Sequence, residues 1–311
     1  MLSVCIVTYQ RGHFLLRCLE SLAANACVDV EVVIVDASTT SMASEVHEVH
    51  PTAVYVHAPQ LAGWMTRSRN EALRHVHGDI VSFLDDDVVV GETWQAGLMS
   101  AFADPDVVAV AGRTRNLQPG EDVYELPVGR FLADGSLTEG FASQHESVIE
   151  VDHGIGANMS FRRSMLATLG GFRDDYPGTA MREDTDMFLR VRRLGGKVVF
   201  APTAVVDHLP APHVKGQRFD TRYKLYGRRN HMVLIARDSG IRSVRLRRWV
   251  IRDYRAVGDA PGFWRLVRRF GVTTLGIAWG TAAIMRCARW QPLSPIRDDP
   301  AAMELRRLLS T

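Results

Sequence analysis

The sequence predicts an α/β protein with a doubly wound, mostly parallel sheet and a helical C-terminal extension. Two observations carry this prediction. Short apolar runs alternate with helical patterns over residues 1–87, and each apolar run ends in polar residues. Strands that are apolar throughout are typical of parallel sheets, in which helices cover both faces.

The expected elements follow one another along the chain. Apolar runs predict strands over residues 2–7, 30–35, 53–57 and 80–84. Apolar residues spaced three and four apart predict helices over residues 14–22, 42–49 and 66–76. Ligands of doubly wound sheets bind beyond the carboxyl ends of the strands. At that edge the sequence places Thr8, Asp36 and the acidic triplet Asp85, Asp86 and Asp87.

The acidic triplet is the most informative feature of the chain. If the strand continues through it, Asp85 and Asp87 project from one face and Asp86 from the other. Carboxylates this close repel one another unless a cation or hydrogen bonds compensate them. A hard divalent cation held by few carboxylates typically also binds substrate phosphates, so the triplet favours a metal-assisted diphosphate site. A solvated loop end is the alternative interpretation.

Composition and charge narrow the class of protein. The 311 residues are 46% hydrophobic and 23% charged, which is typical of a globular protein with one large or two moderate cores. The net charge of +2 gives no indication of nucleic-acid binding. An apolar strand begins at once, without the features of a secretory leader. A reducing cytoplasm is expected, because the cysteines lack zinc-ligand spacing and a chain of this size needs no disulfides; they are Cys5, Cys18, Cys27 and Cys287.

Several different short motifs lie at the polar ends of these elements and further along the chain. They occupy residues 7–9, 35–36, 68–72, 78–79, 84–87, 154–162, 170–172 and 183–186, followed by Arg190 and His208. In this order and spacing they resemble the nucleotide-sugar glycosyltransferases of the GT-A type, specifically family two. The resemblance covers about residues 1–230 and leaves the last part of the chain unassigned.

The resemblance implies a set of residues that contact the sugar-nucleotide donor. Asp36 would hold the nucleoside, Arg69 the nucleotide or its phosphates, and Asp85 the nucleotide or the sugar. The remaining members of the expected set are Thr8, Asp86, Asn158, Glu183 and Arg229. Ordinary structural roles are the alternatives, such as a helix cap for Asp36, a surface arginine for Arg69 and a plain turn around Asn158.

The resemblance also implies a divalent metal. Asp87 would bind the cation directly, and His208, which is far from it in the sequence, would be an additional ligand. An imidazole beside carboxylates favours Mn²⁺, although Mg²⁺ remains an alternative. His208 could instead be a structural histidine, and His153 and His213 are weaker candidates.

Residues 183–186 begin a helical pattern, and Asp184 matches the position of the family's general base. This base would take a proton from an acceptor hydroxyl as the hydroxyl attacks the anomeric carbon, so that one displacement inverts the configuration. Acidic residues at a helix start are also favoured by the helix dipole alone. Asp186 and Glu183 would lie beside it and are the alternatives for the base.

Two domains are expected. Residues 1–235 would form the catalytic domain, with donor binding in about 1–115 and the acceptor and base part in about 116–235. Residues 236–311 would form a basic, helical extension, since residues 241–311 carry fourteen arginines, five acids and no lysine. The apolar run over residues 271–285 is too short to span a bilayer. The arginines and tryptophans there, including Trp290, suit either an anionic membrane surface or packing against the catalytic domain or another subunit.

The sequence therefore predicts an inverting, metal-dependent glycosyltransferase in the cytoplasm or on the inner face of the cell membrane. Its donor would be a UDP-, GDP- or dTDP-linked sugar, and its acceptor a hydroxyl, either lipid-linked or part of a cell-envelope glycan. A sugar nucleotidyltransferase is the rival enzyme class, but it needs a glycine-rich phosphate loop, which residues 8–12 do not form. A degenerate member that binds sugar nucleotide or a partner without turnover is the other alternative, and a homo-oligomer is left open.

Overall fold

The structure is a computed structural model of the chain. It describes residues 1–25, 29–117, 124, 127–178, 180–211, 220–259, 261–286 and 299–311. The candidate ligand His213 lies outside the described residues, as do Trp290, Cys27 and Cys287.

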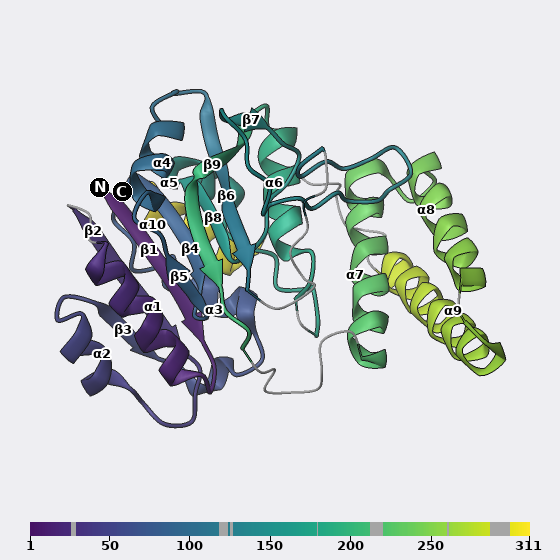
Figure 1. The fold of residues 1–311 in the computed structure, drawn as a ribbon, viewed down its shortest axis with the longest axis horizontal. Coiled ribbons are helices and arrows are strands. Elements are labelled where there is room, and N and C mark those ends of the chain that lie inside the picture. The colour runs from purple at the N-terminus through teal and green to yellow at the C-terminus, as the bar shows by residue number, and fades with distance from the viewer. Residues whose placement is uncertain are drawn as a thin grey trace.

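One mixed sheet runs through the molecule in the order β3-β2-β1-β4-β8-β6-β9-β5, with β7 paired to β9 (Figure 1). The first four of these strands are parallel, as the sequence predicts. Beyond them β8 runs antiparallel to both β4 and β6. The strands are β1 (Leu2–Thr8), β2 (Val30–Asp36), β3 (Val54–His57), β4 (Ile80–Asp85), β5 (Val88–Val90), β6 (Val107–Asn116), β7 (Ile149–Glu150), β8 (Asn158–Arg162) and β9 (Lys197–His208).

Helices cover the sheet and continue beyond it, so the predicted α/β class is confirmed. The α-helices are α1 (Gly12–Ala24), α2 (Ala43–Val49), α3 (Met65–Ala72), α4 (Trp94–Ala101), α5 (Arg163–Leu169), α6 (Glu183–Arg193), α7 (Thr221–Ser239), α8 (Val244–Arg255), α9 (Phe263–Arg286) and α10 (Pro300–Leu309), and short 3₁₀ turns form η1 (Pro59–Leu61) and η2 (Ala256–Asp259). The helix expected over residues 66–76 ends early at Ala72. Tighter turns follow it, in which the backbone N–H groups of Arg74 and His75 donate to the backbone oxygens of Glu71 and Ala72, three residues earlier.

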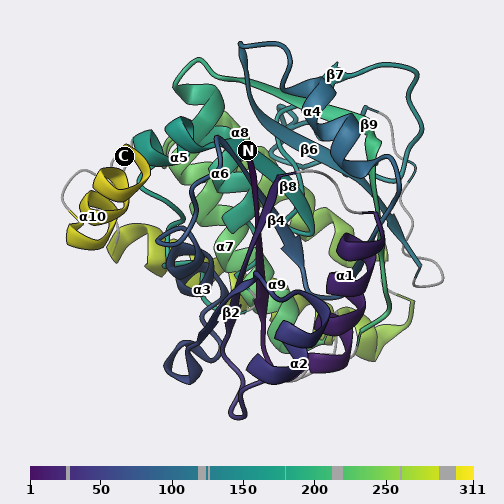
Figure 2. The ribbon, with the colours of Figure 1, turned by 90° about the vertical axis from the view of Figure 1, so that its left-hand side faces the viewer.

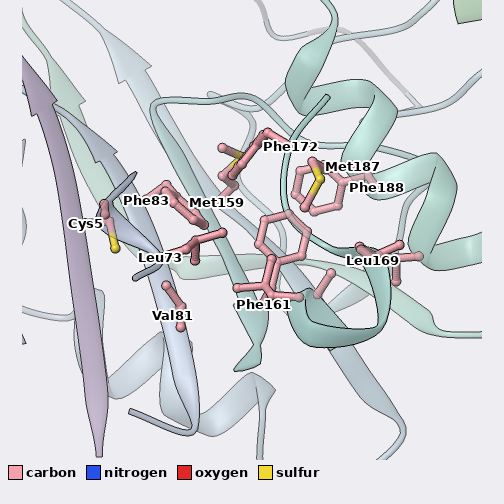
Figure 3. Close-up of a cluster of buried hydrophobic side chains, with 14 of the residues drawn as sticks. Cys5, Leu73, Val81, Phe83, Met159, Phe161, Leu169, Phe172, Met187 and Phe188 are labelled. Atoms are coloured by element: carbon pink, nitrogen blue, oxygen red, sulfur yellow. The ribbon is translucent and has the colours of Figure 1, made fainter. Parts of the chain in front are cut away.

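Alternating side chains of the central strands fill two cores, one on each face of the sheet. On β1, Cys5 lies in one core while Val4 and Ile6 lie in the other. The first core packs aromatic rings of the sheet against α6, with Phe83, Phe161 and Phe188 among them (Figure 3). This explains why the strands read as uninterrupted apolar runs, since both of their faces are buried.

The C-terminal helices do not form one continuous block. α7, α8 and α9 stand together at the right of Figure 1, whereas α10 returns to pack against α5, as Figure 2 shows. Helix α9 approaches α7 closely because Gly276 and Gly280 leave room for Arg228 and Met232. The expected domain boundary near residue 235 falls within α7, and the division into two domains stays a prediction.

None of the helices in the described part of the chain is both long enough and apolar enough to cross a membrane. Helix α9 has the length, with 24 residues, but arginines occupy its first two turns.

Candidate active site

The acidic triplet lies where β4 ends and β5 begins. Asp85 is the last residue of β4, and Asp86 and Asp87 form the turn between the strands rather than a continued strand. β5 then pairs antiparallel with β9, which sets Val88 opposite His208. This pairing brings together Asp85, Asp87 and His208, each of which has one ligand atom within 4.8 Å of the others.

The geometry at His208 fits a cation. Its Nδ1 lies 2.8 Å from Oδ1 of Asn116, so the neutral ring donates there and presents a lone pair at Nε2. That Nε2 lies 3.1 Å from the buried Oδ1 of Asp87. Two acceptors facing each other require a proton or a metal ion between them, and neighbouring ligands of an octahedral ion with bonds of about 2.1 Å are about 3 Å apart. The carboxylate and imidazole donors suit Mn²⁺ or Mg²⁺.

The middle carboxylate, Asp86, has a different environment. It is completely buried and accepts a hydrogen bond of 2.6 Å from Thr8 at the end of β1. Arg11 lies 2.6 Å from Asp86 and donates to Asp87 at 2.7 Å. Burial raises the pKa of Asp86, against the opposing charge of Arg11. Burial would also raise the pKa of Asp87, but the close contact with His208 and the charge of Arg11 lower that pKa.

Arg11 is therefore a site residue that sequence reasoning missed. The available signal was its position, two residues after the motif that ends the first strand, at the same sheet edge as the triplet. As a bridge between two carboxylates it offsets their repulsion.

Asp36 ends β2 at the same edge. It is fully buried, and it accepts a hydrogen bond of 2.8 Å from the backbone of Ser38 and one of 2.5 Å from the hydroxyl of Tyr55. Because β1 and β2 pair Thr8 with Asp36 directly, these two expected donor residues lie side by side on the sheet.

Arg69 connects the triplet to the helix of the expected base. Its guanidinium is buried between Asp85, at 3.1 Å, and Glu183, to which it also donates. A third contact, of 3.4 Å, reaches the backbone oxygen of Gly156, and a Cβ at that glycine would lie 2.9 Å from the guanidinium. Burial and then the charge of Asp184 raise the pKa of Glu183 to about 8, although Arg69 opposes the shift.

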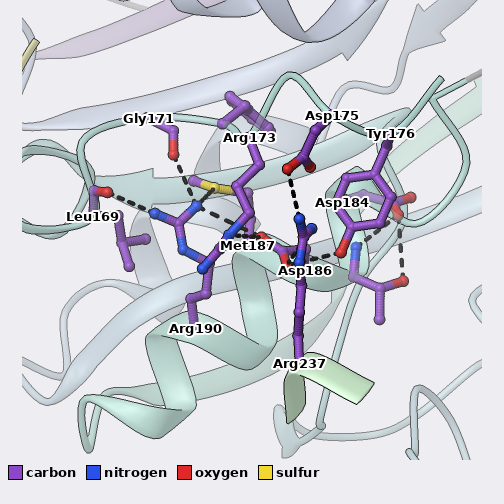
Figure 4. A network of polar contacts seen from close by, with 12 residues as sticks. Leu169, Gly171, Arg173, Asp175, Tyr176, Asp184, Asp186, Met187, Arg190 and Arg237 are labelled. Carbon is purple, nitrogen blue, oxygen red and sulfur yellow. Dashed lines mark hydrogen bonds and ion pairs between the residues drawn. The ribbon is translucent and has the colours of Figure 1, made fainter. Parts of the chain in front are cut away.

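The expected base Asp184 and its alternative Asp186 differ in their surroundings. Asp184 is partly exposed and accepts hydrogen bonds of 3.0 Å from the backbone of Gly156 and 2.6 Å from that of Thr185. Asp186 is 1% exposed, accepts a hydrogen bond from Tyr176 and is surrounded by guanidinium groups (Figure 4). These belong to Arg173, Arg190 and Arg237. Of the two, Asp184 retains the access that an acceptor hydroxyl needs.

Two further residues that were expected to contact the sugar-nucleotide donor form hydrogen bonds within the protein. The buried amide of Asn158 accepts from Trp94 at 3.0 Å and donates to backbone oxygens of Arg113 and Ala204. Arg229 on α7 donates to the backbone oxygen of Asp175 at 2.9 Å. Their contacts with a donor, like that of the buried Asp86, remain predictions.

His153, the weaker metal candidate, is buried away from the Asp85, Asp87 and His208 group. Its Nε2 lies 3.0 Å from the backbone oxygen of Thr138, and burial lowers its pKa. Its hydrogen-bond partners are backbone oxygens, which is typical of a structural histidine.

Proteins with related sequences include two named glycosyltransferases. The chain is 31% identical over 158 residues to the pre-mycofactocin glycosyltransferase of Mycobacterium tuberculosis, which covers 49% of this chain and 31% of that protein. It is 24% identical over 214 residues to the glucosyl-dolichyl phosphate glucuronosyltransferase of Haloferax volcanii, covering 66% and 67% of the two chains. The chain thus spans less than a third of the length of the mycobacterial relative.

Among solved structures, a mannosyltransferase from Pyrobaculum calidifontis, determined with GDP-Man and Mn²⁺, has a TM-score of 0.52 at 18% identity. The match covers 99% of this chain and 84% of that one, and it supports the GT-A fold. A family model described as glycosyl transferase family 2 matches residues 3–170, more than half of the chain. The chain therefore belongs to glycosyl transferase family 2.

Proposed function

We propose that this protein is an inverting glycosyltransferase that moves a sugar from a nucleoside diphosphate to an acceptor hydroxyl with the help of a divalent cation. The observation that carries the proposal is the grouping of Asp85, Asp87 and His208 within 4.8 Å at the carboxyl edge of the sheet. That edge is where doubly wound sheets bind their ligands.

Asp85, Asp87 and His208 would hold the cation. Bound Mn²⁺ or Mg²⁺ would neutralise the diphosphate that leaves during transfer. The mannosyltransferase neighbour, which was determined with GDP-Man and Mn²⁺, supports the use of a cation but does not identify its ligands. Arg11 and Arg69 keep the carboxylates in place, because each arginine contacts two acidic residues.

Asp184 would act as the general base. Its Oδ2 is fixed by the backbone N–H of Gly156, and its Oδ1 by that of Thr185. The carboxylate is thus oriented while staying partly exposed, and it would accept the proton of the acceptor hydroxyl as the new bond forms. Attack from the face opposite the diphosphate inverts the anomeric carbon.

Two of the comparisons support the donor and acceptor classes proposed here. A mannosyltransferase neighbour binds GDP-Man, and one sequence relative is named for a glucosyl-dolichyl phosphate substrate. The donor proposed for this chain is a UDP-, GDP- or dTDP-linked sugar, bound beside Asp36 and Tyr55. The acceptor is a hydroxyl of a lipid-linked or cell-envelope glycan, met by an enzyme on the inner face of the membrane.

A nucleotide screen tests this proposal. With Mn²⁺ present, one of UDP, GDP and dTDP is expected to raise the melting temperature, because a ligand at a hundred times its Kd stabilises a protein by about 2.7 kcal/mol. The corresponding sugar nucleotide should then be hydrolysed slowly or transferred. Stabilisation by none of the three nucleotides, in metal-loaded and folded protein, would contradict the proposal. Binding without any turnover would identify a degenerate family member.

Asn116 is expected to position His208 for metal binding. Asn116→Ala removes the acceptor for Nδ1–H, so Mn²⁺ affinity should fall about 10- to 100-fold, as is usual when the partner of a ligating histidine is lost. Asn116→Asp keeps an acceptor and should retain most of the affinity. Mn²⁺ titration followed by electron paramagnetic resonance measures the change.

The neighbouring Arg115→Gln is the matched control for Asn116→Ala. It breaks the surface ion pair with Asp207 at the same end of β6 and should leave Mn²⁺ affinity unchanged. Equal affinities for wild type and Asn116→Ala would show that Asn116 does not orient the histidine.

A further inference from the structure

The first two turns of α9 project into solvent. Residues 261–270 are all exposed. Among them, Phe263, Trp264 and Phe270 are 70%, 80% and 53% exposed. Helix α9 lies at the far right of Figure 1, away from the sheet. Large apolar side chains in such a group, rather than singly, mark an interaction surface. We call residues 263–270 the α9 tip.

The α9 tip is amphipathic. Phe263, Leu266, Val267 and Phe270 recur at the three- and four-residue spacing that puts them on one face of a helix. The intervening positions hold Arg265, Arg268 and Arg269. An apolar face with aromatic rings, bordered by long cationic side chains, is the pattern of helices that lie in the headgroup layer of a membrane.

Helix α8 adds positive charge next to this tip. The ring of Tyr254 at its end contacts that of Phe270, with 6.0 Å between the centroids. On its exposed face α8 carries Val244 and Ile251, flanked by Arg247, Arg248 and Arg255, while Leu246 and Trp249 are buried on the other side.

The charges argue against a second copy of the chain as the partner. Residues 241–286 contain ten arginines and two acids, and one of the acids, Asp253, is paired with Arg228 at 2.7 Å. A symmetric contact through this surface would bring arginines of the two copies together, which costs free energy. Anionic lipid headgroups supply the negative charge that the surface itself lacks.

We propose that the α9 tip docks on an anionic membrane surface, with Phe263 and Trp264 inserted at the headgroup level and the arginines on lipid phosphates. The proposal extends the proposed function, since a lipid-linked acceptor would be met at that surface, but the docking itself does not depend on turnover. Helix α7 packs against α9 and connects the α9 tip to the active site. Its Asn230 donates to the backbone oxygens of Pro177 and Met181, just before Asp184.

Vesicle co-sedimentation of the full chain tests the docking. The protein should bind vesicles of equal parts phosphatidylcholine and phosphatidylglycerol, bind phosphatidylcholine alone far less, and lose binding at high salt, because the screening length shrinks to about 3 Å at 1 M. Arg265→Gln with Arg269→Gln should weaken partitioning about 30-fold, since each arginine near an anionic surface contributes about a five-fold increase. Phe263→Ser with Trp264→Ser should weaken it at least about ten-fold, because two large apolar side chains no longer insert.

A control variant carries Arg17→Gln on α1 and Met99→Ser on α4, which remove one exposed arginine and one exposed apolar side chain elsewhere. It should bind vesicles as the wild type does. Equal binding by all variants, or no binding to anionic vesicles, would overturn the proposal. So would a dimer that dissociates in the Phe263 and Trp264 variant, which would assign the tip to a second copy. Metal-dependent nucleotide binding, measured without vesicles, reports on the proposed function separately.

Discussion

Asp87→Ala is expected to abolish the metal-dependent binding of a nucleoside diphosphate. The substitution removes the carboxylate that faces His208 at 3.1 Å and is held by Arg11 at 2.7 Å. Without a bound cation, the diphosphate would approach the partly exposed Asp85 directly, and like charges a few ångströms apart repel each other. The difference in melting temperature with and without nucleotide, in Mn²⁺ and in excess chelator, measures the effect.

Asp79→Ala is the matched control for Asp87→Ala. Asp79 precedes the opposite end of β4, and its side chain is 78% exposed. Its replacement should leave nucleotide binding intact. Full activity of the wild type after exhaustive chelation would reject the metal-dependent mechanism, whatever Asp87→Ala does.

Asp184→Asn is expected to lower kcat by about 10² to 10⁴ while donor affinity is kept, because general base catalysis contributes about this factor. The amide retains one oxygen that can accept from Gly156, so the contact with that loop should persist while the hydrogen bond from Thr185 is lost. Steady-state kinetics together with donor binding, measured on the same preparation, separate the loss of chemistry from a loss of affinity.

Asp186→Asn provides the contrast. Because Asp186 is buried among three arginines and Tyr176, its replacement should lower the free energy of unfolding, by about 3 kcal/mol. It should affect kcat only through folding. A large loss of kcat in stable Asp186→Asn, with near-normal Asp184→Asn, would transfer the base to Asp186. A product with retained anomeric configuration would reject single displacement altogether.

Much of the fold could be predicted from the sequence. Apart from the early end of α3 at Ala72, the first four strands and the helices between them occur where the apolar periodicity predicts them, because local burial leaves a local pattern. The parallel half of the sheet follows from that alternation. The antiparallel β8 and the pairing of β5 with β9 left no comparable signal, since they depend on contacts between distant segments.

The candidate site shows the same division. Strand alternation predicted that Asp85 and Asp87 face one cation, and they do lie together with His208, but through a turn that begins at Asp86. The expected link between Asp87 and His208 came from the family resemblance, and the structure supplies its geometric cause in the β5–β9 pairing.

The sequence by itself determined the alternating elements, the acidic sheet edge and the basic C-terminal segment, because residue type and spacing record local geometry and charge. Only the tertiary structure decided that Arg11 bridges two carboxylates, that Asn116 supports His208, and that Asp184 stays accessible while Asp186 is enclosed. These facts depend on which side chains from distant segments share a buried space. Neighbouring acids in one helix look alike in sequence, and burial and partners separate them only after folding.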